Sequence, residues 1–287
     1  MTKLSADQVS GVLAIAERAQ RADGSYPLNE AALSGLQADL PHYVRQVDGE
    51  LAAYLQYDPR YDSAQLVVDP QYRRQGLATA LLKRAGRVPV WAFHDIPAAQ
   101  GLAERVGYLP GRSLLVMAAD IDELKRPREI PEPTTPRLGV RPYRPSDLAE
   151  LVAVNAAAFA HHPEQGQQTA SDFQALMAEE WFDPTGLLLG FDGDALVGFH
   201  WTKLHDKLNG EVYVLGVAPT AQGKGYGRAL LTAGIEHLGE TGVDSVFLYV
   251  DEAEKKPVKL YKLAGFKTAH QDVLYLPQEK LSRDYEQ

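Results

Sequence analysis

The stretch VLGVAPTAQGKGYGRALLTAGIEHL, residues 214–238, carries the strongest structural signal in the sequence. The segment GEVYVLGV, which overlaps its beginning, is rich in β-branched and aromatic residues and predicts a strand. The segment GRALLTAGIEHL, at its end, repeats apolar side chains at the spacing of a helix. Three glycines, Gly223, Gly225 and Gly227, therefore lie between a predicted strand and the start of a predicted helix.

A glycine turn at the start of a helix is suited to binding an anion. The first backbone N–H groups of a helix have no partner within it, and the helix dipole is positive there. Glycines let a phosphate approach those N–H groups closely, and Lys224 and Arg228 would add positive charge. The turn therefore predicts a phosphate or pyrophosphate ligand. A glycine-rich connection without a ligand is the alternative.

Two common phosphate-binding motifs do not fit this turn. A Walker loop would require glycine at position 218 and serine or threonine at position 225, where the chain has alanine and glycine. A dinucleotide fingerprint requires G-x-G-x-x-G, and the chain has G-x-G-x-G. Residues 222–227, QGKGYG, instead match Q/R-x-x-G-x-G/A. In this motif the chain resembles the GNAT acyltransferase superfamily, and the resemblance implies that the turn binds the pyrophosphate of an acyl-CoA.

The same pattern occurs a second time, nearer the N-terminus. The segment AQLVVDPQYRRQGLATALLKRA, residues 64–85, aligns with the glycine-turn segment at an offset of 149 residues. Gly76 then matches Gly225, and Ala78 matches Gly227. A second pair of similar segments, ERVGYLPG and KLAGFKTA, follows at an offset of 158 residues. The chain is therefore predicted to be a tandem duplication of α/β class, with two GNAT acyltransferase domains that each contain a mixed central sheet flanked by helices.

The boundary between the two copies is visible in the composition. The segment DELKRPREIPEPTTPRLG, residues 122–139, is rich in proline and charge, which is typical of an extended linker. We therefore expect an N-terminal domain at 1–125, a linker at 126–139 and a C-terminal domain at 140–287. A helix should open the second domain after its first strand, with Ser146 as N-cap.

The bulk composition excludes several classes of function. The formal net charge of −9 argues against nucleic-acid binding, which requires a basic surface. The chain has no cysteine, so it has no disulfide, cysteine metal site or cysteine nucleophile. His161 and His162 are adjacent, but no third ligand has metal-site spacing, and we expect no metal. The first residues contain no long apolar region and nowhere do 18 apolar residues run together, so we expect no secretory signal, no membrane span and a cytoplasmic protein without a membrane partner.

The two copies differ at the positions that acyl transfer requires. An amine that attacks a thioester must lose a proton, and the leaving thiolate benefits from a proton donor. Glu211, on the strand before the glycine turn, is the candidate base, and Tyr261 is the candidate acid. Their counterparts in the first copy are Asp62 and Ala103, and alanine cannot donate a proton. We infer that the C-terminal copy catalyses and the N-terminal copy is degenerate. A solvated strand-end carboxylate and a core aromatic are the alternative interpretations of Glu211 and Tyr261.

The tetrahedral oxyanion would be bound by backbone N–H groups around Leu215, Gly216 and Val217. Glycine within a strand indicates a bulge or a close backbone approach, and Gly216 therefore predicts one of these.

The chain also resembles a narrower family over nearly its whole length, most strongly in the second half: the mycothiol synthases, which are two-domain GNAT acetyltransferases of actinobacteria. The segments that carry this resemblance are FAHHPEQG (159–166), GFHWTKLHD (198–206) and GEVYVLGVAPTAQGKGYG (210–227). The family transfers acetyl from acetyl-CoA to a small-molecule amine acceptor, the cysteinyl amine of cysteinyl-glucosaminyl-inositol. The resemblance implies the same cosubstrate and acceptor here, with Glu211 as base and acceptor contact and Tyr261 as acid.

The resemblance also implies binding residues in both halves. Those that would contact the acceptor are Glu30, Glu164, Lys203, Glu211 and Tyr249. Those that would hold acetyl-CoA in the second half are Leu215, Gly216, Val217, Gln222, Gly223, Lys224, Gly225, Tyr226, Gly227, Arg228, Glu254, Lys255, Lys256, Pro257, Val258 and Lys259. The stretch 254–257, EKKP, departs from the N-x-x-A of the family, but proline is accepted in the first turn of a helix. Those that would hold a second acetyl-CoA in the first half are Leu66, Val67, Val68, Arg74, Gln75, Gly76, Leu77, Ala78 and Thr79.

Two other functions remain open at this point. A GNAT enzyme of the same chemistry could act on another amine, such as a protein N-terminus, an antibiotic or a polyamine. A non-catalytic acyl-CoA sensor is an alternative of a different class. We expect a monomer in each case.

Overall fold

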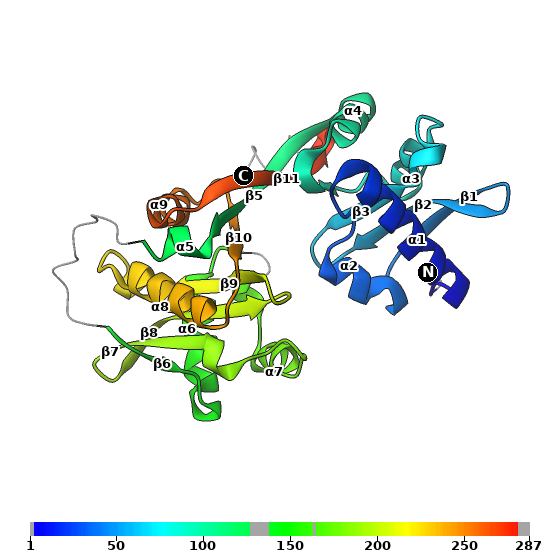
Figure 1. The fold of residues 1–287 in the computed structure, drawn as a ribbon. Helices are drawn as coiled ribbons and strands as arrows, with labels where there is room; N and C mark the ends of the chain where they lie inside the picture. Colours follow the sequence, from blue (N-terminus) through cyan, green and yellow to red (C-terminus); the bar gives the residue numbers. More distant parts are fainter. Residues whose placement is uncertain (1–2, 127–137, 163–164, 281–287) are drawn as a thin grey trace. The chain divides into compact units, whose positions relative to one another are not determined.

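The computed structural model describes residues 3–126, 138–162 and 165–280, which form two compact units (Figure 1). Unit 1 combines residues 1–114 with residues 270–287, and unit 2 comprises residues 115–269. The domain boundaries expected from the sequence, an N-terminal domain ending at 125 and a C-terminal domain beginning at 140, stay a prediction. Residues 127–137 of the expected linker lie outside the described residues. Each unit is an α/β structure with a mixed sheet and helices on both faces, as expected.

Unit 1 contains the first copy of the repeat. Its helices are α1 (Ala6–Asp23), α2 (Glu30–Ser34), α3 (Leu77–Arg84) and α4 (Pro97–Val106), with 3₁₀ turns η1 (Gly35–Gln37), η2 (Pro70–Tyr72) and η3 (Phe93–Asp95). Its strands are β1 (His42–Val47), β2 (Glu50–Asp58), β3 (Ser63–Val68) and β4 (Val90–Ala92), followed by the beginning of β5 (Tyr108–Asp120) and the end of β11 (Lys267–Pro277). The sheet order is β1-β2-β3-β4-β11, with β3 and β4 parallel and the other neighbours antiparallel.

Unit 2 contains the second copy. Its helices are α5 (Ile121–Leu124), α6 (Leu148–Ala158), α7 (Ala170–Met177), α8 (Tyr226–Glu240) and α9 (Lys255–Ala264), with 3₁₀ turns η4 (Pro145–Asp147), η5 (Gln165–Gln167), η6 (Pro184–Gly186) and η7 (Pro219–Ala221). Its other strands are β6 (Gly139–Pro142), β7 (Leu187–Asp192), β8 (Ala195–Leu204), β9 (Asn209–Val217) and β10 (Ser245–Asp251). Here β9 and β10 are the parallel pair, and β6 to β9 are antiparallel neighbours.

The two faces of each sheet follow from the alternation of side chains along a strand. In β2 of unit 1, Tyr54 packs with α1, whereas Ala53 and Leu55 pack with α3 on the other face. In β8 of unit 2, Trp201 packs with α7, and the neighbouring His200 faces α8. Helices thus cover both faces of each sheet, and a ligand can reach the sheet at the ends of its strands.

Two strands pass from one unit to the other along the chain. Strand β5 begins in unit 1, and its residues Leu115 and Met117 belong to the core of unit 2. Strand β11 begins in unit 2, and its residues Val273–Tyr275 pair with β4 in unit 1. No helix among the described residues has the length and apolar character needed to cross a membrane.

Candidate functional site

The glycine turn of unit 2 leads directly into helix α8. Gly223 and Gly225 have φ angles of 80° and 83°, in the left-handed region that only glycine adopts without strain, and Gly225 is the N-cap of the helix. The backbone N–H groups of Gly223, Gly225, Tyr226 and Gly227 donate to no other described residue. These donors and the positive end of a 15-residue helix make a site for an anion, as the sequence predicts.

Unit 1 repeats this turn at the positions that the repeat predicts. Gly76 is the N-cap of α3 with a φ of 80°, and it matches Gly225. The position that matches Gly223 is Arg74, which keeps a left-handed φ of 66° although it is not glycine. The duplicated segments therefore share their backbone conformation, which supports the alignment of the two copies.

Tyr226 and Lys224 both contact Asp192, an acidic residue at the end of β7 beside the turn of unit 2. The Tyr226 hydroxyl donates to Asp192 Oδ2 at 2.8 Å, and Lys224 Nζ lies 3.4 Å from the same atom. The hydrogen bond from Tyr226 lowers the pKa of Asp192, so the carboxylate stays charged. Lys224 is half-exposed, and its ammonium lies 5.7 Å from the centre of the Tyr226 ring.

Strands β9 and β10, both described in full, are paired only at their beginnings. Their register runs from Asn209↔Ser245 to Glu211↔Phe247, whereas the strands continue to Val217 and Asp251. Beyond Glu211, the polar backbone groups on this edge of β9 are therefore open to a ligand. In unit 1, β3 and β4 are likewise paired only at Ala64↔Val90 and Gln65↔Trp91.

Gly216 lies against aromatic side chains, so neither predicted alternative, a bulge or the close approach of another backbone, is found at this residue. A Cβ atom at this position would lie 2.9 Å from the Phe159 ring and 3.0 Å from the Phe199 ring. The bulge is elsewhere in the same strand: the β8–β9 register shifts between Trp201↔Val214 and Thr202↔Val212, which leaves Tyr213 as the extra residue. In unit 1 the β2–β3 register is regular from Ala53↔Val68 to Asp58↔Ser63.

Glu211, the predicted base, is buried and makes a short contact with a histidine. Its side chain is 8% exposed, and its Oε2 lies 2.6 Å from Nε2 of His205, whose side chain is 29% exposed. His205 also packs against Phe247, with ring centres 4.9 Å apart. A buried carboxylate with one oxygen engaged leaves its other oxygen for an amine, which is compatible with a base rather than with a solvated strand end.

Lys203 lies directly opposite Glu211 in the β8–β9 register. The residue is only 5% exposed, and its ammonium lies 4.6 Å from the centre of the Trp181 ring and 5.3 Å from that of Tyr213. Aromatic faces attract a cation, and the attraction is stronger when water is excluded. The sequence thus brings together two of its expected acceptor contacts, Lys203 and Glu211, on neighbouring strands.

Tyr261, the predicted acid, is buried in helix α9. It is 6% exposed, and its ring packs edge-on against Phe266 at 5.9 Å. Burial raises the pKa of its phenol well above the usual range, so the group keeps its proton. Its hydroxyl has no hydrogen-bond partner among the described residues. A hydroxyl without a partner among the described residues is consistent with a catalytic acid, and the packing of the ring is also that of a core aromatic.

The remaining predicted residues of unit 2 lie around β10 and α9. Tyr249 is exposed, and its ring contacts Phe247 at 6.0 Å. Glu254 is the N-cap of α9, and Pro257 lies in its first turn, as expected. Lys255 donates to the carbonyl of Glu252 at 2.9 Å, and Lys256 and Lys259 are exposed on the same helix. Val258 packs in the core. Glu164 lies outside the described residues.

Unit 1 contains a cavity of about 230 Å³ at the place predicted for a second acyl-CoA. Eight of the nine predicted residues line it: Leu66, Val67, Val68, Arg74, Gly76, Leu77, Ala78 and Thr79, but not Gln75. Ala103, the counterpart of Tyr261, also lines it. Asp62, the counterpart of Glu211, lies outside β3 in an exposed turn, where it accepts from the Tyr57 hydroxyl at 2.8 Å. The cavity therefore has neither a base nor an acid at the positions that match unit 2.

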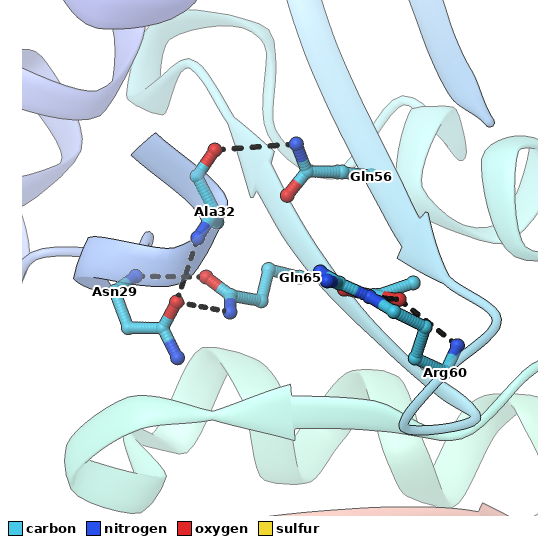
Figure 2. A network of polar contacts seen from close by, with 6 residues as sticks. Asn29, Ala32, Gln56, Arg60 and Gln65 are labelled. Atoms are coloured by element: carbon cyan, nitrogen blue, oxygen red, sulfur yellow. Dashed lines mark hydrogen bonds and ion pairs between the residues drawn. The ribbon is translucent and has the colours of Figure 1, made fainter. Parts of the chain in front are cut away.

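Glu30, predicted to contact the acceptor, is the first residue of α2 in unit 1. Asn29 and Gln65 exchange two hydrogen bonds of 2.8 and 2.6 Å, which fix the start of α2 on β3. Asn29 also caps the helix through the N–H of Ala32, whose carbonyl accepts from the buried Gln56 on β2. Figure 2 shows this network, which fixes the backbone of Glu30.

Sequence reasoning did not identify three side chains of the unit 2 site: His205, Trp181 and Tyr213. His205 lies in the segment GFHWTKLHD that carries the family resemblance, six residues before Glu211. Its contact depends on the hairpin that brings β8 back as β9, and only that pairing reveals it. Among the described residues no cluster of three or more His, Cys, Asp or Glu side chains could hold a metal. His162 instead accepts from the N–H of Gln165 through Nδ1 at 3.0 Å.

Comparison with known proteins matches the two halves separately to one family model. The model for the acetyltransferase (GNAT) family matches residues 12–108 and residues 154–266. Among solved structures, a GCN5-related N-acetyltransferase from Sphaerobacter thermophilus is 25% identical, with a TM-score of 0.68 over 95% of this chain and 93% of that one. A tandem GNAT protein from the clavulanic acid biosynthesis pathway is 15% identical, with a TM-score of 0.64 over 96% of this chain and 95% of that one, and shows the same fold.

Curated relatives are similar over nearly the full length. The mycothiol acetyltransferase of Propionibacterium freudenreichii subsp. shermanii is 44% identical over 96% of this chain and 90% of the relative. That of Thermomonospora curvata is 42% identical over 95% of this chain and 94% of the relative. These similarities cover both units, including the first copy of the repeat.

Proposed function

The chain belongs to the acetyltransferase (GNAT) family and, within it, to the mycothiol acetyltransferases, and from this premise we propose the reaction that it catalyses. It transfers acetyl from acetyl-CoA to the cysteinyl amine of cysteinyl-glucosaminyl-inositol, the last step of mycothiol biosynthesis. The observation that carries this proposal is that the pairing of β9 with β10 ends at Glu211. From Glu211, strand β9 continues to the glycine turn, whose N–H groups are open to a ligand. This arrangement supports placing a thioester beside a buried carboxylate.

The reaction requires a defined set of proton movements. The acceptor begins as an ammonium, and Glu211 removes one proton so that the nitrogen lone pair can attack the thioester carbonyl. The C–N bond forms, and backbone N–H groups around Leu215–Val217 stabilise the oxyanion. The C–S bond then breaks, the amide nitrogen loses its second proton, and the thiolate is protonated. One proton is released to solvent for each acetyl group transferred.

Tyr261 would supply the proton to the thiolate. Burial of the side chain raises the pKa of its phenol, so the hydroxyl keeps its proton at neutral pH. A coenzyme thiol should have a pKa near the usual cysteine value of about 8.5, below that of the Tyr261 phenol, so Tyr261 would assist the departing thiolate as a hydrogen-bond donor while the C–S bond breaks. The absence of cysteine from the chain supports direct transfer without a thioester-linked enzyme intermediate.

Lys203, Tyr249 and Glu211 would contact the acceptor from unit 2. The ammonium of Lys203 donates hydrogen bonds and accepts none, which suits the hydroxyl oxygens of the sugar and inositol. The carboxylate of Glu211 suits the cysteinyl ammonium. Glu30 and Glu164 are assigned to the acceptor by resemblance alone and stay predictions.

We further propose that unit 1 binds a second acetyl-CoA without turning it over. The cavity lined by Leu66–Val68 and by most of residues 74–79 supports binding. Ala103 and the exposed Asp62 support the lack of turnover, because neither provides the group present in unit 2. Arg73 is held by Asp23 at 2.6 Å within this unit, so Arg74 is the arginine that remains to meet phosphate.

Turnover by the purified full chain tests the function. Acetyl-CoA and cysteinyl-glucosaminyl-inositol should release free CoA and consume the acceptor amine in equal amounts. Equal rates with generic peptide N-termini or polyamines would overturn the assignment of the acceptor. Binding of acetyl-CoA without release of CoA from any amine would indicate a sensor. Equilibrium titration with acetyl-CoA should give two sites per chain, and one site would overturn the second-site proposal.

A further inference from the structure

The carboxylate of Glu211 is held by a residue that the acetyl-transfer mechanism does not use. His205 is the first residue after β8, in the turn that leads to β9, and its Nε2 lies 2.6 Å from Glu211 Oε2. For His205 to hold the base form of Glu211, its Nε2 must carry the hydrogen and donate it to the carboxylate. No described residue contacts Nδ1 of His205 through a hydrogen bond.

The turn that carries His205 is fixed by its own hydrogen bonds. The backbone N–H of His205 donates to the carbonyl of Asn209 at 3.0 Å. The carboxylate of Asp206 accepts from the backbone N–H groups of Leu208 and Asn209 at 2.7 and 2.9 Å. The Asn209 side chain in turn accepts from the Ser245 hydroxyl at 2.8 Å, which ties the turn to β10. These hydrogen bonds fix the backbone of the turn from which the His205 side chain extends.

The ring of His205 is also restrained from one side. Phe247, the residue paired with Glu211 on β10, packs against it with ring centres 4.9 Å apart. On the other side, the β8–β9 register pairs Glu211 with Lys203, whose ammonium lies over the Trp181 and Tyr213 rings. His205 thus engages Oε2 of Glu211, and among the described residues no side chain is hydrogen-bonded to Oε1, the oxygen available to the acceptor.

We propose that His205 is a positioning residue for acetyl transfer. Its Nε2–H fixes the Glu211 carboxylate in the rotamer that presents Oε1 to the acceptor ammonium, a proposal that rests on the proposed role of Glu211 as base. The imidazole does not itself receive the proton. A hydrogen bond to a charged group is worth enough to change turnover by roughly 10- to 100-fold when it is removed.

Two substitutions separate the hydrogen bond from the packing. His205→Gln removes the ring but places an amide N–H the same number of bonds from Cβ as Nε2, so it can still donate to Glu211. His205→Phe keeps an aromatic ring against Phe247 but removes the donor. We expect H205Q to keep kcat within about threefold of the parent enzyme, and H205F to lose about 10- to 100-fold in kcat with the KM for acetyl-CoA unchanged.

The opposite pattern, an active H205F and an impaired H205Q, would overturn the proposal in favour of ring packing. Equal losses in both variants would overturn it in favour of a role for the imidazole itself. Because His205 acts through Glu211, H205F should have no further effect in an E211Q background, and additive losses would also overturn it.

A measurement that needs no activity keeps the proposal testable if a variant fails to fold. Nitrogen-15 NMR of the full-length parent chain should show His205 as the Nε2–H tautomer, and Glu211→Gln should change the Nε2 signal. A Nδ1–H tautomer would overturn the proposal. Turnover of the parent enzyme with the acceptor is measured beside these variants, so a failure of the proposed function is distinguished from a failure of the His205 assignment.

Discussion

Arg73 and Gln222 make the same hydrogen bond in the two copies of the repeat. Arg73 Nε donates to the carbonyl of Val68 at 3.4 Å, and Gln222 Nε2 donates to that of Val217 at 3.2 Å. Each side chain thus ties the turn to the end of the preceding strand, five residues earlier. We expect Gln222→Ala to raise the KM for acetyl-CoA about fivefold, since a hydrogen bond contributes about 1 kcal/mol. Gln222→Arg, the residue of the other copy, should recover most of that loss, and steady-state kinetics with both variants would show it.

Substitution of Gly225 tests whether the left-handed conformation of the glycine turn is needed to bind acetyl-CoA. Gly225→Ala forces a side chain into the left-handed region at a cost of about 1–2 kcal/mol and places a methyl group at the helix start. The KM for acetyl-CoA should rise at least about tenfold.

Gly227→Ala is the matched control for folding. A Cβ at position 227 would meet nothing closer than 3.7 Å, and the other copy has Ala78 there. G227A should therefore unfold at the same temperature as the parent, whereas equal destabilisation of both variants would contradict the role of the left-handed turn.

Tyr261→Phe should lower kcat and leave the KM for acetyl-CoA nearly unchanged. The substitution removes only a hydroxyl that has no partner among the described residues, so the cost to stability should be small. Loss of a general acid typically costs about 10²- to 10⁴-fold in rate. Tyr54→Phe, a buried tyrosine of unit 1, is the control and should retain parental turnover. An unchanged kcat in Y261F would contradict the role of Tyr261 as acid and would favour the alternative that it is only a core aromatic.

Lys203→Met should weaken binding of the acceptor specifically. Methionine fills the space between Trp181 and Tyr213 but cannot donate to a hydroxyl group. Loss of a charged hydrogen bond predicts an increase of about 10- to 100-fold in the KM for the acceptor, with the KM for acetyl-CoA unchanged. Unchanged kinetics for both substrates would favour an amine acceptor other than the pseudo-disaccharide.

His200 should make unit 2 sensitive to acid. Its Nδ1 contacts the carbonyl of Leu230 at 2.9 Å, its Nε2 is buried without a partner, and burial lowers its pKa to about 4. Because the unfolded state binds the proton first, stability is present above about pH 6.5 and falls as the pH decreases towards 4. The loss is at most about 3 kcal/mol. Urea unfolding of His200→Leu should show a smaller decrease between pH 7 and 4.5 than the parent, and identical decreases would contradict this.

Local sequence signals predicted the elements around the site well. Three glycines in six residues required a turn with left-handed φ angles, and the structure has it at Gly223 and Gly225. Pro257 lies in the first turn of α9 as the chemistry of proline requires. The expectation that Ser146 caps the next helix was wrong. Pro145 begins a 3₁₀ turn, and Asp147, held by Arg141 at 2.7 Å, is the N-cap instead.

Features that depend on pairing between strands could not be predicted from the sequence. The bulge at Tyr213 and the contact between His205 and Glu211 are fixed by the register of β8 and β9, which no local pattern encodes. The packing of Trp181 over Lys203 joins a loop before β7 to β8 and depends on the tertiary structure of the aromatic core. Composition likewise gives no signal that Val273–Tyr275 complete the sheet of unit 1.

That last feature makes the fusion of the two copies difficult to reverse. A gene break within residues 126–139 would yield an N-terminal polypeptide whose strand β4 lacks Val273–Tyr275 as neighbours, and a C-terminal one deprived of Leu115 and Met117. Each fragment would expose an apolar strand edge, which favours aggregation. On this argument the N-terminal copy is needed for the chain to fold, irrespective of any catalysis of its own.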